Sequence, residues 1–338
     1  MKNKNLIYLV VLVVLLAVAG WLLSSQPTDS TLERTQDYSF TIEDTAAIDK
    51  IIIKDKTPAE ITLTREKNRW MVDGEFKARD EAVNTLLETL HRMQMRNFLA
   101  ENIKPTVIKR MTVFGKEVQI FKNGLLFKTI YVGTETHDEM ATYMMIKGSD
   151  APYAVYIPGF NGYLSSRFFT QSHLWRSRDV ALMKAGEIKE VEMVYPDSSA
   201  SSFKISVFNR DSLFVTQSST GKVLRKVNQV KVKLFLAALS KLKYEGAILA
   251  TEPISRKRDS LLASTPVFYL QYKNMDGKAT RLEGYKIKGP AESFDPERDA
   301  PEYDLDRMHG FINQDRMVLL QYHGMRGVFK SVNYFTKP

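Results

Sequence analysis

The most chemically suggestive stretch of this chain is an acidic segment at residues 292–306. Four of its acids have a spacing that resembles positions 1, 3, 5 and 12 of an EF-hand calcium loop, namely Asp295, Glu297, Asp299 and Asp306. Ala300 stands where that loop requires glycine, and Pro301 follows it. The last acid is also shorter than the bidentate glutamate of an EF-hand. We therefore favour a solvated loop over a Ca²⁺ site and nominate no metal ligand.

The histidines give no stronger indication of chemistry. The five are scattered along the chain, at His91, His137, His173, His309 and His323. His137, Asp138 and Glu139 form the nearest approach to a ligand cluster. Adjacent residues of a strand point to opposite faces, so only a loop would let Asp138 assist His137. A solvated loop is the interpretation we favour.

Motifs of the common enzyme classes are absent from the sequence. It contains no G-x-x-x-x-G-K-[ST], G-x-G-x-x-G, G-x-S-x-G or H-E-x-x-H pattern. It also contains no cysteine, which excludes disulfides, thiolate metal sites and a cysteine nucleophile. We nominate no catalytic, cofactor-binding or metal residue, expect no cofactor, and expect a protein that is not an enzyme.

The amino terminus predicts a membrane anchor. Residues 6–23 carry no charge, and as a helix they would rise roughly 27 Å, close to the hydrocarbon thickness of a bilayer. Lys2 and Lys4 precede them, so the positive-inside rule places residues 1–5 in the cytoplasm. We expect a single-pass protein of the cell inner membrane that contacts the lipid bilayer through residues 6–23, with the bulk of the chain in the periplasm.

A cleaved signal peptide is the competing interpretation. Ala17, Val18 and Ala19 form an A-x-A pattern that would allow cleavage before Gly20. The apolar run continues through Leu23, where a signal peptide usually becomes polar. This favours an uncleaved anchor, and both interpretations export the remainder of the chain.

The remainder repeats one pattern of apolar positions, with offsets that only increase along the chain. Three of the matches are between continuous segments: residues 48–53 with 188–193, residues 121–123 with 272–274, and residues 155–157 with 318–320. A fourth match pairs Ile61, Leu63 and Trp70 with Ile205, Val207 and Phe214. The fifth pairs the helical positions Val83, Leu86, Leu87, Leu90 and Met93 with Val232, Phe235, Leu236, Leu239 and Leu242. Increasing offsets indicate two copies of one unit, the second with longer loops.

Each copy predicts strands, one main helix and further strands. Ile51 and Ile53 alternate with polar residues as in a half-buried strand. Val83 begins an apolar helical stripe, for which Asp80 is the candidate amino-terminal cap. Asn123-Gly124 between apolar runs predicts a hairpin.

The predicted fold is α+β, with an N-terminal transmembrane helix and two tandem, mostly antiparallel β-rich units, each covered by one main helix. The predicted segments are a tail at 1–5, a transmembrane helix at 6–23, a stalk at 24–45, a first repeat at 46–165, a connector at 166–187 and a second repeat at 188–338. Five aromatic residues near the connector are expected to pack the seam between the copies, namely Phe160, Tyr163, Phe168, Phe169 and Trp175.

The net charge of +9 is compatible with anionic lipid headgroups or acidic polymers as partners. The basic residues cluster at 222–233 and 256–258. Polar faces of the folded units explain these clusters adequately. Nucleic acid is not an expected partner outside the cytoplasm.

Residues at the repeat boundaries resemble a known family. Trp70-Met71-Val72, Ala78-Arg79-Asp80 and residues 175–180 (WRSRDV) are similar to the bacterial domain-of-unknown-function family 4340. The resemblance extends over about residues 45–335. It implies one amino-terminal membrane segment and a repeated exported α+β region. It also implies a partner class, because some relatives are associated with gliding-motility-type ABC transport systems.

Two functions follow from these observations. The first is a non-enzymatic binding or scaffold component of an envelope complex, such as one that contains an ABC transporter. The alternative is an envelope polysaccharide hydrolase, because paired carboxylates can act without a recognisable motif. Its acids would come from residues 292–306, although no pair can be selected there.

Overall fold

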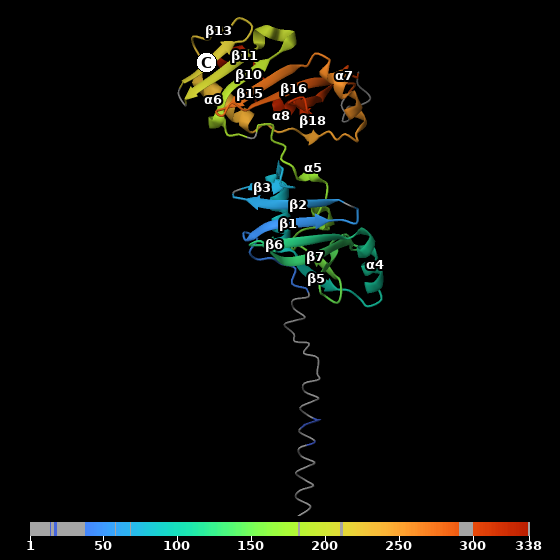
Figure 1. The fold of residues 1–338 in the computed structure, drawn as a ribbon. Helices are drawn as coiled ribbons and strands as arrows, with labels where there is room; N and C mark the ends of the chain where they lie inside the picture. The colour runs from blue at the N-terminus through green and yellow to red at the C-terminus, as the bar shows by residue number, and fades with distance from the viewer. Residues whose placement is uncertain are drawn as a thin grey trace, which may run out of the picture. The chain divides into compact units, whose positions relative to one another are not determined.

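The structure is a computed structural model that describes residues 14, 17–18, 38–57, 59–67, 69–181, 183–209, 212–290 and 300–336. The chain divides into two compact units, Met1–Arg176 and Ser177–Pro338. Each unit is built on one nine-stranded sheet (Figure 1). All pairings between the named strands are antiparallel. The prediction of two tandem β-rich units is confirmed.

The first unit has the strand order β4-β3-β2-β1-β6-β7-β8-β9-β5. Its strands are β1 Ile48–Lys54, β2 Glu60–Glu66, β3 Arg69–Val72, β4 Phe76–Lys77, β5 Gln94–Phe98, β6 Lys116–Lys122, β7 Leu125–Glu135, β8 Thr142–Ile146 and β9 Tyr153–Tyr156. Its helical segments are α3 Asp80–Arg92, α4 Lys104–Phe114, η1 Ser165–Arg167 and α5 Ser172–Trp175.

The second unit has the order β13-β12-β11-β10-β15-β16-β17-β18-β14. Its strands are β10 Ile188–Val194, β11 Phe203–Asn209, β12 Ser212–Gln217, β13 Lys222–Val223, β14 Gly246–Ala247, β15 Phe268–Asn274, β16 Ala279–Lys288, β17 Tyr303–Ile312 and β18 Arg316–Gln321. Its helical segments are η2 Ala185–Glu187, η3 Pro196–Ser201, α6 Gln229–Ser240, η4 Pro253–Lys257, α7 Arg258–Leu262, α8 Tyr322–Met325 and η5 Val332–Phe335.

The two strand orders are the same when nine is added to each strand number of the first unit. The helices correspond as well, because α3 joins β4 to β5 as α6 joins β13 to β14, and α4 joins β5 to β6 as η4 and α7 join β14 to β15. This shared connectivity supports the internal repeat that the apolar positions predicted.

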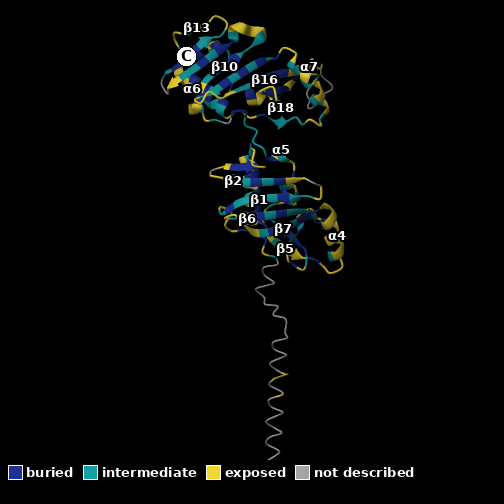
Figure 2. Ribbon diagram, in the orientation of Figure 1, coloured by how far each residue is buried: buried dark blue, intermediate teal, exposed yellow. Residues whose placement is uncertain are grey.

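Alternation along the strands divides each sheet into two apolar faces, since successive side chains point to opposite sides. In the first unit Ile51 and Ile53 pack with α3, whereas Tyr131 and Met145 pack with α4. The second unit has the same division into a large cluster with α6 and a smaller one that includes Leu261 of α7. Buried residues follow the central strands of both sheets (Figure 2). The second covering helix of each unit was not predicted.

The β6/β7 hairpin closes where Asn123-Gly124 predicted it. Both residues have positive φ, 50° and 77°. Such values match the right-handed twist of two flanking strands, and glycine adopts them without steric cost.

Strand pairing corrects several of the residue matches between the copies. The match of 155–157 with 318–320 is displaced by two residues, because Val155 and Leu320 take the same place in the two sheets. Ile51 pairs with Leu63 in the first unit, and Val191 pairs with Ile205 in the second. Leu63, and not Ile61, is therefore the equivalent of Ile205. A shift of two residues retains the inward and outward pattern of a strand, so the apolar pattern alone could not detect this error.

Two further matches were displaced by one residue. Ile120 takes the place of Tyr272, because these residues pair with Ile51 and Val191 respectively. Phe121 was the predicted equivalent. Similarly, Trp70 corresponds to buried Leu213, and not to exposed Phe214. A one-residue shift places a side chain on the opposite face, and the burial of Leu213 identifies the correct register.

The helix matches agree with the structure, and one cap prediction is wrong. Helix α3 begins at Asp80 and α6 begins at Gln229, which keeps the predicted offset of the helical stripe. Asp80 is the first helical residue, and the capping residue is Arg79, which makes no side-chain cap. Asp80 still favours the helix because its charge lies at the positive end of the helix dipole.

The aromatic residues near the predicted connector belong to the first unit. Phe168 and Trp175 are buried in the cluster that contains Ile51. The Trp175 ring stacks on Phe169 at 4.1 Å, and its Nε1–H donates to the Phe169 carbonyl at 2.8 Å. The prediction that these aromatics pack a seam is wrong for Phe160, Phe168, Phe169 and Trp175, which complete a core within one copy, whereas Tyr163 is exposed.

The predicted membrane segment at 6–23 lies outside the described residues except for Val14, Ala17 and Val18. Among the described parts of the chain, no helix combines the length and apolarity needed to cross a bilayer.

Candidate binding sites

Most of the acidic segment at 292–306 lies outside the described residues, and the described chain resumes at Ala300. Asp306, the last acid of the EF-hand-like spacing, lies in β17. The adjacent Asp304 is buried, and its Oδ1 accepts hydrogen bonds from the backbone N–H groups of Asp306 and Arg307 at 2.7 and 2.9 Å. This carboxylate therefore stabilises the backbone at the start of β17.

The loop that contains His137 is held in place by hydrogen bonds to Asp138. Asp138 Oδ2 accepts from Arg96 at 2.8 Å, and Oδ1 accepts from the Thr136 hydroxyl at 2.6 Å. These hydrogen bonds, that of Thr136 first, lower the pKa of Asp138 to about 2. No group of three or more His, Asp or Glu side chains among the described residues could hold a metal ion. Asp138 thus fixes a loop.

A buried carboxylate that was not singled out from the sequence lies on the second face of the second sheet. The Glu283 side chain is only 1% exposed, and Arg281 Nε lies 2.5 Å from its Oε1. Tyr285 donates to Oε2 at 2.7 Å, and Gln314 donates to Oε1 at 3.0 Å. Arg281, Glu283 and Tyr285 alternate along β16, so the i, i+2 spacing was the available signal. With both oxygens engaged, Glu283 has a structural role.

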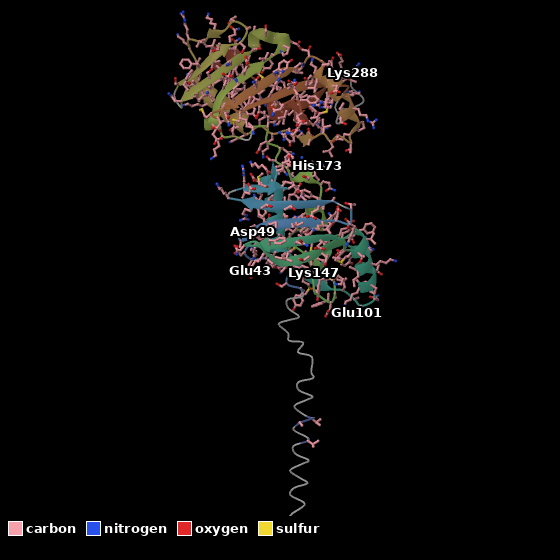
Figure 3. All side chains as sticks on the ribbon, in the orientation of Figure 1. Glu43, Asp49, Glu101, Lys147, His173 and Lys288 are labelled. Atoms are coloured by element: carbon pink, nitrogen blue, oxygen red, sulfur yellow. The ribbon has the colours of Figure 1, made fainter. Side chains whose placement is uncertain are left out.

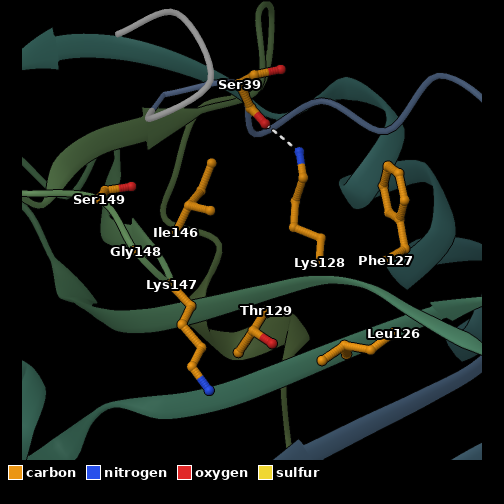
Figure 4. A pocket seen from close by; sticks show the side chains of 9 residues that line it. All are labelled: Ser39, Leu126, Phe127, Lys128, Thr129, Ile146, Lys147, Gly148 and Ser149. Atoms are coloured by element: carbon orange, nitrogen blue, oxygen red, sulfur yellow. Dashed lines mark hydrogen bonds between the residues drawn. The ribbon is translucent and has the colours of Figure 1, made fainter. Parts of the chain in front are cut away.

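The first unit contains a pocket of about 700 Å³ at one end of β7 and β8 (Figure 4). Its lining residues are Ser39, Leu126, Phe127, Lys128, Thr129, Ile146, Lys147, Gly148 and Ser149. Two lysines and no acid are among them, so the pocket suits an anionic group better than a cation.

One of those lysines, Lys128, binds the backbone of the segment that precedes β1. The Lys128 ammonium donates to the Ser39 carbonyl oxygen (Figure 4). Burial lowers the pKa of Lys128, and the nearby charge of Lys122 lowers it further. An anion near these two ammonium groups would relieve that repulsion.

The second unit contains a more apolar groove of about 580 Å³ beside α6. Its lining residues are Ala185, Gly186, Val207, Asn209, Leu213, Lys233, Leu236 and Met275. The groove therefore extends from α6 to the β11/β12 hairpin and to the turn after β15. A mostly apolar lining with one lysine suits an apolar segment that carries a carboxylate.

Helix α6 also presents apolar residues to solvent. Val230 and Leu234 lie four residues apart on one helical face and are 65% and 58% exposed. The equivalent positions of α3 in the first unit are the polar residues Glu81 and Thr85, which are exposed. Two copies with one topology thus differ in the character of this face.

Paired carboxylates, which a retaining or inverting glycosidase uses, are absent from the pockets described above. A further pocket of about 190 Å³, next to α4, is lined by Lys56, Ile108, Met111, Thr112, Gly115, Tyr131 and Met145. None of these three described pockets is lined by Asp or Glu. The carboxylates that are buried, Glu283 and Asp304, are engaged in hydrogen bonds.

A family model described as "Domain of unknown function (DUF4340)" matches residues 70–260, which is more than half of the chain. The chain belongs to the DUF4340 family. The matched range of this DUF4340 protein begins in β3 of the first unit and ends in α7 of the second. It is shorter than the range of about 45–335 over which the resemblance was expected. No curated protein and no solved structure matches the chain.

Proposed function

We propose that this protein is a membrane-anchored, extracytoplasmic binding or scaffold component of an envelope complex. Residues 6–23 cross the inner membrane once, residues 1–5 remain in the cytoplasm, and both β-rich units lie in the periplasm. The uncharged run of 18 residues after Lys2 and Lys4 supports this orientation.

The observation that carries the binding role is the exposed apolar face of α6. Exposed apolar residues beside a groove are typical of interaction sites. Val230 and Leu234 supply such a face, and the neighbouring groove supplies a cavity. The first unit has Glu81 and Thr85 instead, so the fold itself does not require apolar residues there.

The proposed partner is a membrane protein complex, with an ABC transporter as the class that the family resemblance suggests. Lys233 at the groove, and Lys226 and Lys231 near the start of α6, favour a partner surface that combines apolar and acidic residues. Catalysis is not part of the proposal, because a hydrolase would need a pair of carboxylates in a cleft.

Site-specific photo-cross-linking in intact cells tests this function. A photoreactive phenylalanine analogue at Leu234 should yield a discrete cross-linked membrane protein, identified by mass spectrometry. The matched control places the same analogue at Thr85, the equivalent position of α3, which should yield no such product. Cross-linking of the same products from both positions, or of none from Leu234, would contradict a partner-binding role for α6.

A further inference from the structure

The β6/β7 hairpin of the first unit carries three consecutive apolar residues that are open to solvent. Leu125, Leu126 and Phe127 are 75%, 53% and 49% exposed. A strand that covers a core normally buries every second side chain, so three exposed apolar neighbours are not explained by packing within the unit.

Lysines lie on both sides of these apolar residues. The Nζ atoms of Lys122 and Lys128 lie 4.2 and 5.7 Å from the centroid of the Phe127 ring. The nearby carboxylate of Asp49 accepts a hydrogen bond from the Gly124 N–H at 2.5 Å and so stabilises the turn. Apolar side chains with cationic neighbours are the composition of surfaces that insert into the headgroup region of a bilayer. Figure 3 labels charged residues in both units, among them Asp49 and Lys147 of the first unit and Lys288 of the second.

The residues that precede β1 lie beside the same hairpin. Lys128 donates to Ser39, and Ser39 lines the pocket together with Leu126 and Phe127. Tyr38 has its ring 5.8 Å from that of Phe98, another exposed aromatic residue. The segment that arrives from the amino terminus therefore meets the unit at its exposed apolar end.

The length of the preceding chain limits how far this end can lie from the bilayer. Residues 24–37 separate the predicted membrane segment from Tyr38. Fully extended, they span at most about 50 Å. The equivalent hairpin of the second unit has no such apolar run, because its turn reads Met275-Asp276-Gly277-Lys278 and leads into Ala279.

We propose that the β6/β7 hairpin docks on the outer surface of the anionic bilayer to which the protein is anchored. Leu125, Leu126 and Phe127 enter the boundary between headgroups and acyl chains, and Lys122 contacts lipid phosphates, while Lys128 keeps its hydrogen bond to Ser39. This docking rests on the membrane anchorage proposed above. It would hold the first unit against the membrane and fix the direction in which the chain leaves it.

The absence of cysteine permits a direct test by site-specific labelling. Leu126→Cys in the full chain, labelled with the environment-sensitive fluorophore NBD, is reconstituted into vesicles of phosphatidylcholine and phosphatidylglycerol. We expect blue-shifted emission and quenching by a lipid with a spin label near its headgroup. The control is Glu75→Cys in the exposed turn between β3 and β4, with two strands between β3 and β6, where neither effect is expected. A probe at Leu125→Cys should reproduce the result.

Flotation of the same vesicles separates the two proposals. If the protein floats but the probe at position 126 shows the emission of an aqueous environment, as the probe at position 75 does, the docking is overturned and the anchorage remains intact. Protein that fails to float would overturn both. Adding Lys122→Glu to Leu126→Cys should reduce the quenching without reducing flotation, whereas unchanged quenching would overturn the role of that lysine.

Discussion

The hydroxyl of Tyr285 donates a hydrogen bond of 2.7 Å to Glu283 Oε2 and so stabilises a carboxylate that is almost fully buried. Burial raises the pKa of Tyr285, and the adjacent Glu283 carboxylate raises it further. Tyr285 therefore remains a donor over the whole physiological pH range. The ring also packs edge-on against Phe311 at 5.6 Å, which joins the polar network to the smaller apolar cluster of the second unit.

Tyr285→Phe should lower the free energy of unfolding of the second unit by about 1–2 kcal/mol. The variant keeps the ring contacts but leaves one oxygen of buried Glu283 without its donor. Urea denaturation of the full chain measures the effect. Tyr163→Phe, at a more exposed tyrosine, is the control and should change stability by less than about 0.5 kcal/mol. Equal effects of the two variants would argue against a stabilising role for the Glu283 network.

Substitutions at equivalent core positions should reduce the stability of the two units by similar amounts. Ile53 and Met193 take the same place in the two sheets, and both are fully buried. Ile53→Ala and Met193→Ala should each destabilise their own unit by about 2–5 kcal/mol, because each removes apolar contacts and leaves a cavity. Hydrogen exchange followed by mass spectrometry assigns the loss to residues of one unit. Increased exchange that spreads equally over both units would contradict two separate cores.

The repeat could be predicted from the sequence because its strongest evidence is a helical stripe. Val83 and Val232 begin stripes of several apolar residues, and a helical pattern of that length fixes the register. The strands offered two or three apolar residues each, and a shift of two leaves such a pattern unchanged. The equivalence of Leu63 with Ile205 could therefore be established only from strand pairing.

The second unit should lose stability as the pH falls below the ordinary pKa of histidine. Burial lowers the pKa of His309 from 6.5, Asp304 opposes this effect, and Lys257 adds to it. The folded state therefore binds a proton at this ring more weakly than the unfolded state does, so stability rises with pH around the ordinary pKa of histidine. Denaturation between about pH 7 and pH 5 should show a smaller loss for His309→Gln than for the natural protein.

The titration of Asp138 does not explain a loss of stability between about pH 7 and pH 5. The pKa of Asp138 is lowered to about 2, so this group stabilises the folded state above its ordinary pKa of 3.8. The contribution is lost as the pH falls from there toward 2. A natural protein whose stability is constant between about pH 7 and pH 5 would contradict the lowered pKa of His309.

The apolar face of α6 should serve binding and not stability. Val230→Glu with Leu234→Thr copies the residues of α3, and the new glutamate lies in the first turn, where the helix dipole favours an acid. The free energy of unfolding should change by less than about 0.5 kcal/mol, since both side chains are exposed. Recovery of cross-linked partner from a probe at Lys233 should be lost. Full recovery with unchanged stability would exclude this face from binding.

Less of the candidate sites than of the fold could be predicted from the sequence. Exposed apolar residues such as Leu126 and Leu234 have the same types as core residues, and only the folded arrangement shows that they face solvent. The burial of Glu283 could not be predicted either, because it depends on Gln314 and Tyr285, which become its neighbours only in the folded sheet. The absence of catalytic motifs, by contrast, was evident from the sequence alone.

Reporter fusions test the central claim most directly, namely that an uncleaved anchor at 6–23 places both units outside the cytoplasm. Alkaline phosphatase fused after Pro338 should be active in cells, and green fluorescent protein at the same position, exported through the general secretory route, should not fluoresce. The phosphatase fusion should remain in washed membranes at full length. A fluorescent carboxyl-terminal fusion together with an inactive phosphatase fusion would contradict the claim.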